Sequence, residues 1–305
     1  MSKVEIKIIT DEDEEGRRLD NYLIGHLNKV PRELIYRIIR KGEVRVNRGR
    51  KKQSYRLQIG DAVRIPPIHS AESAPVKVND DTRDLIESSI IFEDDRLICV
   101  NKPTGLAVHG GSSLNYGLIE AIRVIRENRK FELAHRIDRD TSGCLVVAKD
   151  GRALRAIQEQ FKNRAVVKVY DFFAVGLWNT RNKSVHKKLM RYKTAWGERR
   201  VKIDATGQTA RTDFRVIEKA QSATRMEAIL HTGRTHQIRV HAAACGNPIV
   251  GDKKYGNHEG SSPRLCLHAT RLSFVIDEHK YKFEAPQGED LGIIWAKIAR
   301  GDRLD

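Results

Sequence analysis

The sequence predicts an α+β protein in which a small basic domain precedes a larger domain built around a sheet. Three observations support this prediction. Apolar residues recur at helical spacing between residues 19 and 39, apolar runs typical of strands dominate after residue 90, and a polar segment separates the two regions. Helical segments interrupt the later strands without an internal repeat or a glycine-rich phosphate loop, so a sheet-centred fold is expected.

The composition limits the class of protein. With 305 residues, 40% of them hydrophobic, the chain can bury a sizeable core, which excludes a disordered protein. Its formal net charge of +16 favours a polyanionic partner, with nucleic acid preferred over an anionic membrane. The sequence shows no apolar run of about 18 residues and no secretory leader, which predicts a cytoplasmic protein. The cysteines are scattered without a CxxC pair, so free buried thiols are expected: Cys99, Cys144, Cys245 and Cys266.

The front of the chain predicts two short helices and a small strand unit. Leu19, Leu23 and Leu27 recur at helical spacing. A second helix begins at Pro31, where a proline is tolerated in the first turn, and Gly42 ends it. The segments that follow are an alternating strand at 43–47, a basic turn at 48–52 and a second strand segment at 57–66.

Five short pieces of this region occur in a characteristic order: Gly16–Asp20, Val30–Arg32, Ile39–Gly42, Val44–Asn47 and Gly60–Asp61. Together they resemble the small RNA-binding domain named after ribosomal protein S4, from about residue 16 to 66. The alternative is a basic helical hairpin that only keeps the protein soluble. The resemblance implies phosphate contacts, which supply affinity more than sequence choice. The expected contact residues are Arg37, Arg40, Lys41, Arg48, Arg50, Lys51 and Lys52.

A linker and a larger domain follow. Residues 68–84 contain serines, a proline and acidic residues but few apolar positions, so the front domain is expected to be mobile. The expected division is an N-terminal arm at 1–15, an RNA-binding domain at 16–67, a linker at 68–84, a large domain at 85–290 and a C-terminal tail at 291–305. Within the large domain we expect strands at 90–92, 97–100, 145–148, 166–175, 209–217 and 223–230, and helices at 115–128, 151–163 and 235–244.

The segment His135–Gly143 places Asp138 between two arginines, directly before the apolar run 144–148. The neighbouring guanidinium groups favour the ionised carboxylate, which could serve as a nucleophile or as an anchor for a substrate hydroxyl. The plain alternative is a solvated ion-pair loop, a contact worth about 0 to 1 kcal/mol. The apolar flanks favour a charged turn against a buried strand. Asp140 is chemically an equal candidate.

Two other segments carry polar residues beside expected strands. Tyr170, taken alone, is typical of a strand-edge residue with its hydroxyl at the surface. The segment Thr232–His241 contains His236 and His241, but no acidic or thiol partner lies at ligand spacing, so no metal site is expected.

The joint order of six motifs resembles the RNA pseudouridine synthases of the branch that modifies large-subunit ribosomal RNA. These motifs are Asn101–Leu106, His135–Gly143, Lys168–Tyr170, Gly233–His241, Gly246–Asp252 and Leu267–Ala269. The S4-like domain in front narrows the resemblance toward the subgroup labelled C, with subgroup D as the nearest alternative. The resemblance implies a mixed, mostly antiparallel central sheet flanked by helices.

The resemblance also implies the reaction and its residues. Uracil is detached from its ribose, rotated and reattached through carbon five, without cofactor or metal. Asp138 matches the catalytic aspartate, whether it acts on the glycosidic carbon, on the base or by elimination. Arg239 matches the basic residue that pairs with it, Tyr170 matches the tyrosine that stacks on the base, and Arg136 is expected to displace the target uridine from its stack.

Other interpretations remain open at this level. A non-catalytic ribosome-assembly protein is one, although the motif residues argue against it, and a phosphoryl-transfer enzyme would need a carboxylate cluster for metal, which the sequence does not show. The basic segment 183–200 predicts either an insertion over the RNA or a solvated hairpin. Nothing in the sequence requires a protein partner or more than a monomer.

Overall fold

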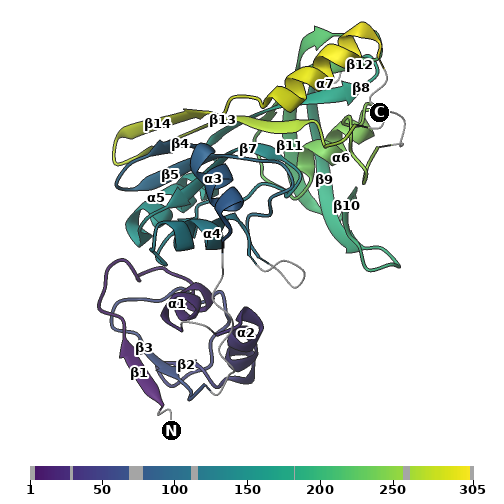
Figure 1. The fold of residues 1–305 in the computed structure, drawn as a ribbon. Helices are drawn as coiled ribbons and strands as arrows, with labels where there is room; N and C mark the ends of the chain where they lie inside the picture. Colours follow the sequence, from purple (N-terminus) through teal and green to yellow (C-terminus); the bar gives the residue numbers. More distant parts are fainter. Residues whose placement is uncertain are drawn as a thin grey trace.

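The computed structural model describes residues 4–27, 30–68, 78–110, 116–181, 183–256 and 262–302. The front of the chain forms a three-stranded antiparallel sheet in the order β1-β3-β2, beside two helices (Figure 1). The elements are β1 (Glu5–Ile8), α1 (Leu19–His26), α2 (Arg32–Lys41), β2 (Arg45–Val46) and β3 (Ala62–Ile65). Helices α1 and α2 confirm the two helices predicted from the sequence. Leu23, Ile35 and Val63 are fully buried in the core between these helices and the sheet.

The rest of the chain forms one eleven-stranded sheet. Its strand order is β10-β9-β11-β12-β8-β13-β7-β5-β4, with β14 paired to β13 and β6 to β7. Within the described ranges only β13 and β7 pair in parallel, which confirms the predicted mixed, mostly antiparallel sheet. The strands are β4 (Ile90–Glu93), β5 (Leu97–Lys102), β6 (Glu132–Leu133), β7 (Ser142–Ala148), β8 (Val167–Val175), β9 (Ser184–Lys193), β10 (Arg199–Ile203), β11 (Gln208–Lys219), β12 (Ala223–Leu230), β13 (Leu267–Ile276) and β14 (His279–Glu284).

Helices flank the sheet, as expected. They are α3 (Asp80–Ser88), α4 (Leu118–Ile125), α5 (Gly151–Lys162), α6 (Gln237–Ala244) and α7 (Glu289–Arg300). Strand β7 is buried along its whole length because both of its faces are covered. Cys144 and Val146 pack in the same cluster as α5, whereas Leu145 and Val147 pack with α4, as the alternation of side chains along a strand requires. None of the helices in the described ranges is both long and apolar enough to cross a membrane.

The structure differs from the expected domain boundaries at three places. Strand β1 lies inside the expected N-terminal arm and pairs with β3. Helix α3 begins at Asp80, where the side chain of Asn79 accepts a hydrogen bond from Thr82 N, so the expected linker to residue 84 is too long; residues 69–77 of that linker lie outside the described residues. The expected C-terminal tail contains α7, which packs on the core through Leu291, Ile294 and Ile298.

The front domain is held against the large domain by polar contacts. Arg17 Nε lies 2.7 Å from Glu132 Oε1, and each of these side chains is 8% exposed. Asn21 Nδ2 donates to the other Glu132 oxygen at 2.6 Å. Lys130 adds ion pairs to Asp11 and Asp13. A buried ion pair resists separation because each partner would leave the other uncompensated. In this structure the front domain therefore contacts the large domain through a set of polar pairs.

Candidate active site

A pocket opens where the loop before β7, the middle of β8 and the start of α6 meet. All four residues predicted for the reaction line it, although they are distant in the sequence: Arg136, Asp138, Tyr170 and Arg239. The other lining residues are Ile137, Thr141, Leu230, Gly233, Arg234, Thr235, His236, Gln237, Ile238 and Leu267. The fold therefore brings the three sequence motifs with unusual polar residues to one place.

The loop that carries Asp138 is held by residues at and just after the end of β5. Lys102 is completely buried, and its ammonium donates to the carbonyl oxygens of Arg139 (2.9 Å), Leu106 (3.0 Å) and Pro103 (2.7 Å). Thr104 Oγ1 donates to the carbonyl of Asp140 at 2.8 Å. The motif containing Lys102 was part of the family resemblance, but its supporting contacts to the loop become visible only in three dimensions.

A glycine lets this loop enter the sheet. Gly143 has a φ of +109°, and an added Cβ would lie 2.3 Å from the carbonyl oxygen of Ala269. This close approach belongs to the parallel pairing of β7 with β13, where Ser142 pairs with His268. Because only glycine accommodates that backbone and that distance, Gly143 sets where the loop ends and where Asp138 faces.

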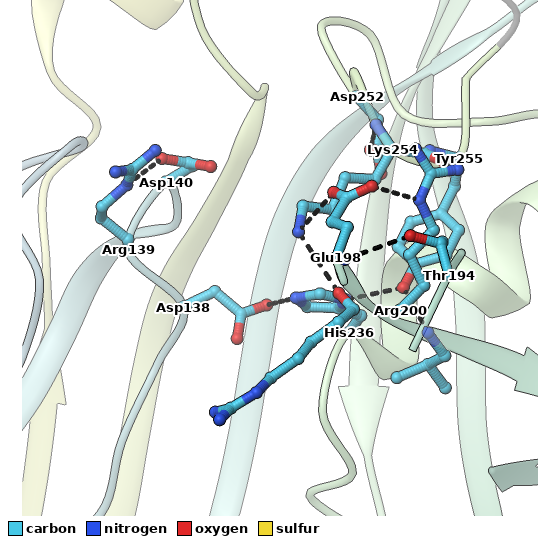
Figure 2. A network of polar contacts seen from close by, with 12 residues as sticks. Asp138, Arg139, Asp140, Thr194, Glu198, Arg200, His236, Asp252, Lys254 and Tyr255 are labelled. Atoms are coloured by element: carbon cyan, nitrogen blue, oxygen red, sulfur yellow. Dashed lines mark hydrogen bonds and ion pairs between the residues drawn. The ribbon is translucent and has the colours of Figure 1, made fainter. Parts of the chain in front are cut away.

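The two carboxylates of the loop have different surroundings. The Asp138 side chain is 24% exposed and lines the pocket. The Asp140 side chain is 42% exposed and pairs with Arg139 at 3.1 Å. Figure 2 shows that Asp138 points toward His236, while Arg139 and Asp140 lie together on the other side of the loop. Geometry therefore favours Asp138 over Asp140, a choice that the chemistry of the sequence left open.

The nearest basic group to Asp138 is His236, which the sequence motif contained but which we did not expect as a site residue. Its Nε2 lies 3.7 Å from Asp138 Oδ2, and its Nδ1 lies 2.6 Å from the hydroxyl of Tyr255. Its backbone has a φ of +53°, a left-handed conformation that a non-glycine residue adopts at some cost. Strained backbone conformations concentrate at functional sites, so this conformation of His236 indicates a functional position.

Tyr255 and Asp138 contact opposite ring nitrogens of His236 and together favour one tautomer. The carboxylate of Asp138 faces Nε2 at 3.7 Å, which favours a proton on that nitrogen and leaves Nδ1 to accept from the Tyr255 hydroxyl. The Tyr255 oxygen in turn accepts a hydrogen bond from Val201 N at 2.9 Å. Burial raises the pKa of Tyr255 to about 12 and lowers that of His236, so the phenol is protonated and the imidazole is neutral at pH 7. The remaining proton of His236 then lies on Nε2, facing the carboxylate of Asp138.

Arg239 is placed differently from the expectation. Its Nε and Nη2 bond to the two oxygens of Asp252 at 2.8 and 2.7 Å, so its direct partner is Asp252 and not Asp138. The side chains of Arg239 and Asp252 are 4% and 0% exposed, and the guanidinium also lies 5.2 Å from the centre of the Tyr255 ring. Burial opposes its charge, but Asp252 and then Asp138 raise the pKa of Arg239. Its positive charge therefore acts on Asp138 through space.

Tyr170, in the middle of β8, lines the pocket. Burial and then the negative charge of Asp138 raise the pKa of Tyr170 well above its usual value, so its phenol stays protonated at neutral pH. A partly buried aromatic ring beside an anion offers a flat apolar surface, which suits a planar base. Arg136 lines the same pocket and is exposed to solvent, where an incoming strand can reach it.

The residues predicted to bind RNA in the front domain lie at its surface. Six are exposed and Lys51 is half-buried, with its ammonium 4.6 Å from the centre of the Tyr55 ring. None of the seven forms an ion pair with another described residue: Arg37, Arg40, Lys41, Arg48, Arg50, Lys51 and Lys52. These positive charges are therefore available to an external anion.

The mixed sheet, the carboxylate pocket at its centre and the basic front domain define a class of RNA-modifying enzyme, the pseudouridine synthases with an accessory RNA-binding domain. Residues 96–244 match the family model described as RNA pseudouridylate synthase, and residues 17–63 match that of the S4 domain. Together with the relatives below, these matches show that the chain belongs to the RNA pseudouridylate synthase family.

Several curated relatives are similar over nearly the whole chain. The protein named Ribosomal large subunit pseudouridine synthase C of Haemophilus influenzae is 47% identical over 280 residues, which cover 88% of this chain and 87% of that protein. Its namesake of Escherichia coli is 42% identical over 302 residues, or 94% of each. The predicted resemblance to subgroup C and to the S4 domain is thus confirmed.

Two human structures support the fold. Human RNA Pseudouridylate Synthase Domain Containing 1 superposes with a TM-score of 0.57 and 27% identity, over 65% of this chain and 83% of that one. Human RNA Pseudouridylate Synthase Domain Containing 4 gives a TM-score of 0.59 at 23% identity, over 72% of this chain and 95% of that one.

Proposed function

We propose that this protein converts specific uridines of large-subunit ribosomal RNA to pseudouridine, with Asp138 as its catalytic group and without a cofactor. The observation that carries the proposal is the position of Asp138, a carboxylate in a pocket that also contains Tyr170 and the charge of Arg239. The RNA target follows from relatives named for the large ribosomal subunit. We place this activity in the cytoplasm and assign it to a monomer that needs no protein partner.

The reaction breaks the bond between uracil N1 and ribose C1′ and forms a bond from C1′ to carbon five. The proton on carbon five leaves and N1 gains one, so the atoms balance without an oxidant or reductant. We assign to Asp138 the step that releases the base. Arg239 places a positive charge near this carboxylate, since Asp138 is one of the groups that raise the pKa of Arg239.

Tyr170 and Arg136 are assigned to holding the base. A uridine must leave its stack to reach a pocket inside the protein, and unstacking costs a few kcal/mol. Arg136 lies at the exposed side of the pocket, where it can occupy the space that the base leaves. The ring of Tyr170 can then stack on the displaced uracil and keep it close while it rotates. The position of each side chain in the pocket that contains Asp138 supports these roles.

The test compares two chemically identical changes. Asp138→Asn removes the charge but keeps the shape, whereas Asp140→Asn does the same two residues away on the exposed side of the loop. Pseudouridine is mapped in ribosomal RNA from cells that lack the gene and carry either variant. We expect no modification with Asp138→Asn and normal modification with Asp140→Asn. Sites still modified by Asp138→Asn would contradict the assignment.

A further inference from the structure

The hairpin formed by β9 and β10 ends in an exposed tryptophan. Trp196 is 96% exposed, so it contributes almost no buried surface to the fold. The turn that presents it is well defined. Thr194 N donates to Glu198 O at 2.9 Å, Gly197 N donates to Thr194 O at 2.9 Å, and Gly197 adopts a φ of +78°. A tryptophan held in water by an ordered turn is suited to contact another molecule, since tryptophan is enriched at interfaces and stacks on nucleic-acid bases.

The same hairpin is fastened to the active site. Glu198, next to the turn, pairs with Lys254 at 2.9 Å and with Arg200 at 2.7 Å, and Arg200 also donates to the carbonyl of Lys254. Val201 N donates to Tyr255, which contacts His236 beside Asp138. Figure 2 shows this continuous group of side chains between the hairpin and Asp138. The position of the turn is therefore fixed relative to the catalytic carboxylate.

The strands that carry the turn hold unbalanced positive charge. Lys193 and Arg199 are directly opposite each other in the antiparallel register, and both side chains are exposed. Like charges in that relationship destabilise a sheet. Neither residue, nor exposed Arg191 further along β9, forms an ion pair with a residue in the described part of the chain. An external polyanion would relieve this repulsion, whereas a neutral protein surface would not.

We propose that the β9–β10 hairpin is an RNA-binding arm in which Trp196 stacks on an unpaired base of the substrate, near the target uridine. Arg191, Lys193 and Arg199 hold the phosphates on either side of that base. The inference rests on the proposed function, since it places a second base of the same RNA at a fixed position from Asp138. An indole ring stacks on any base, so the arm selects for an unpaired, accessible strand more than for a sequence.

Three variants of the full-length protein test the arm. Trp196→Ala removes the ring, Trp196→Phe keeps a smaller stacking surface, and Ile293→Ala removes an apolar side chain that is 58% exposed on α7, away from the tip of the hairpin (Figure 1). Affinity is measured for a single-stranded oligouridylate and for a fully paired RNA duplex of equal length. Trp196→Ala is expected to weaken oligouridylate binding about 5- to 150-fold and to leave duplex binding unchanged.

Two of the variants serve as controls. Trp196→Phe should retain most of the affinity, and Ile293→Ala all of it, because both keep an aromatic ring at the tip of the arm.

Wild-type affinity of Trp196→Ala for oligouridylate would overturn the proposal, as would an equal loss on the duplex. Because oligouridylate binding requires no turnover, this result is independent of whether Asp138→Asn abolishes modification. A failure of the arm and a failure of the proposed activity can therefore be told apart.

Tryptophan fluorescence reports on the same contact directly. The sequence contains three tryptophans. Trp178 is 3% exposed, and Trp295 is half-buried against the core, where it donates to Glu218. Trp196 is thus the indole that a base can stack on. We expect oligouridylate to quench the emission of the wild-type protein and to leave that of Trp196→Phe unchanged. Equal quenching of both proteins would show that the base binds elsewhere.

Discussion

Tyr255 donates a hydrogen bond to Nδ1 of His236 across 2.6 Å, and through it this tyrosine controls the ring that faces Asp138. The two residues come from different segments, since His236 precedes α6 and Tyr255 lies in the turns that follow it. Together with Asp138, the contact favours one tautomer and one orientation of the imidazole. Hydrogen bonds thereby connect Val201, Tyr255 and His236, whose Nε2 lies 3.7 Å from Asp138 Oδ2.

Removing the Tyr255 hydroxyl should slow the reaction without weakening substrate binding. In Tyr255→Phe the imidazole loses the donor that orients it, and a misplacement of about 1 Å at a reacting group costs up to about 100-fold in rate. We expect kcat to fall about 10- to 100-fold with KM unchanged. Steady-state kinetics on unmodified large-subunit RNA measure both. Tyr281→Phe, which removes a hydroxyl on β14 that bonds Asp94 outside the pocket lining, should behave as wild type. A change in KM alone would argue against an orienting role.

Removing Asp252 should destabilise the protein strongly, because it would leave the guanidinium of Arg239 buried without its partner. Breaking a buried ion pair from one side costs about 3 to 5 kcal/mol. We expect Asp252→Ala to lower the free energy of unfolding in urea by about that amount. The matched control is Asp302→Ala, since Asp302 pairs with Arg300 at the surface, where such a pair contributes about 0 to 1 kcal/mol. Similar losses in the two variants would contradict the importance of burial.

The Arg239–Asp252 pair also shows a feature that the sequence alone could not predict, the partner of a buried charge. Arg239 could be assigned to the site from its motif, but its partner depends on how the chain returns after α6. Two carboxylates, Asp138 and Asp252, are both compatible with a nearby arginine, and only the three-dimensional distances decide between them. Local sequence patterns predict helices and strands better than they predict which distant residues form a pair. Strand β12 agrees with its predicted range of 223–230 because alternating apolar residues and flanking turn residues define both of its ends.

The misplaced boundaries have physical reasons too. Most of helix α7 lies in the segment that we expected to be a C-terminal tail. The sequence did contain a signal for it, because Leu291, Ile294 and Ile298 are spaced so as to lie on one face of a helix. Strand β1 also had a signal, the alternation of apolar and polar residues from Val4 to Ile8, but it does not mark a buried face. Ile6 and Ile8 are 64% and 62% exposed on an edge strand, so no core defines that segment, and only its pairing with β3 makes it a strand.

Acid should destabilise the protein through a buried neutral histidine. His241 is 0% exposed. Its Nδ1 accepts a hydrogen bond from the hydroxyl of Thr212, and the Thr212 oxygen accepts one from Gln237 Nε2. A proton on Nδ1 would therefore face the proton that Thr212 donates. Burial lowers the pKa of His241 from 6.5 to about 4. Between these two values the unfolded chain binds a proton and the folded chain does not, so stability falls as pH decreases from 6.5 to 4.

The expected loss from His241 alone is about 3 kcal/mol when the pH falls across the whole of that window. It is measured as the free energy of unfolding in urea at a series of pH values. His241→Asn keeps an acceptor oxygen near Nδ1 but cannot titrate, so its stability should be lower at pH 7 and should decline less steeply below. An identical pH profile for the variant and the wild type would mean that other groups cause the acid sensitivity.

Neutralising the front domain should change how RNA binding responds to salt. Arg40, Lys41 and Lys52 are exposed and form no ion pair within the described residues. Each neutralised phosphate releases counterions, so the slope of log affinity against log salt falls by about 0.7 to 0.9 for every phosphate that is no longer bound. The triple alanine variant should therefore bind large-subunit RNA more weakly at low salt, with a slope shallower by about 2 to 3. A control with Lys280→Ala and Lys282→Ala, exposed on β14, should keep the wild-type slope. An unchanged slope in the triple variant would place the bound phosphates outside the front domain.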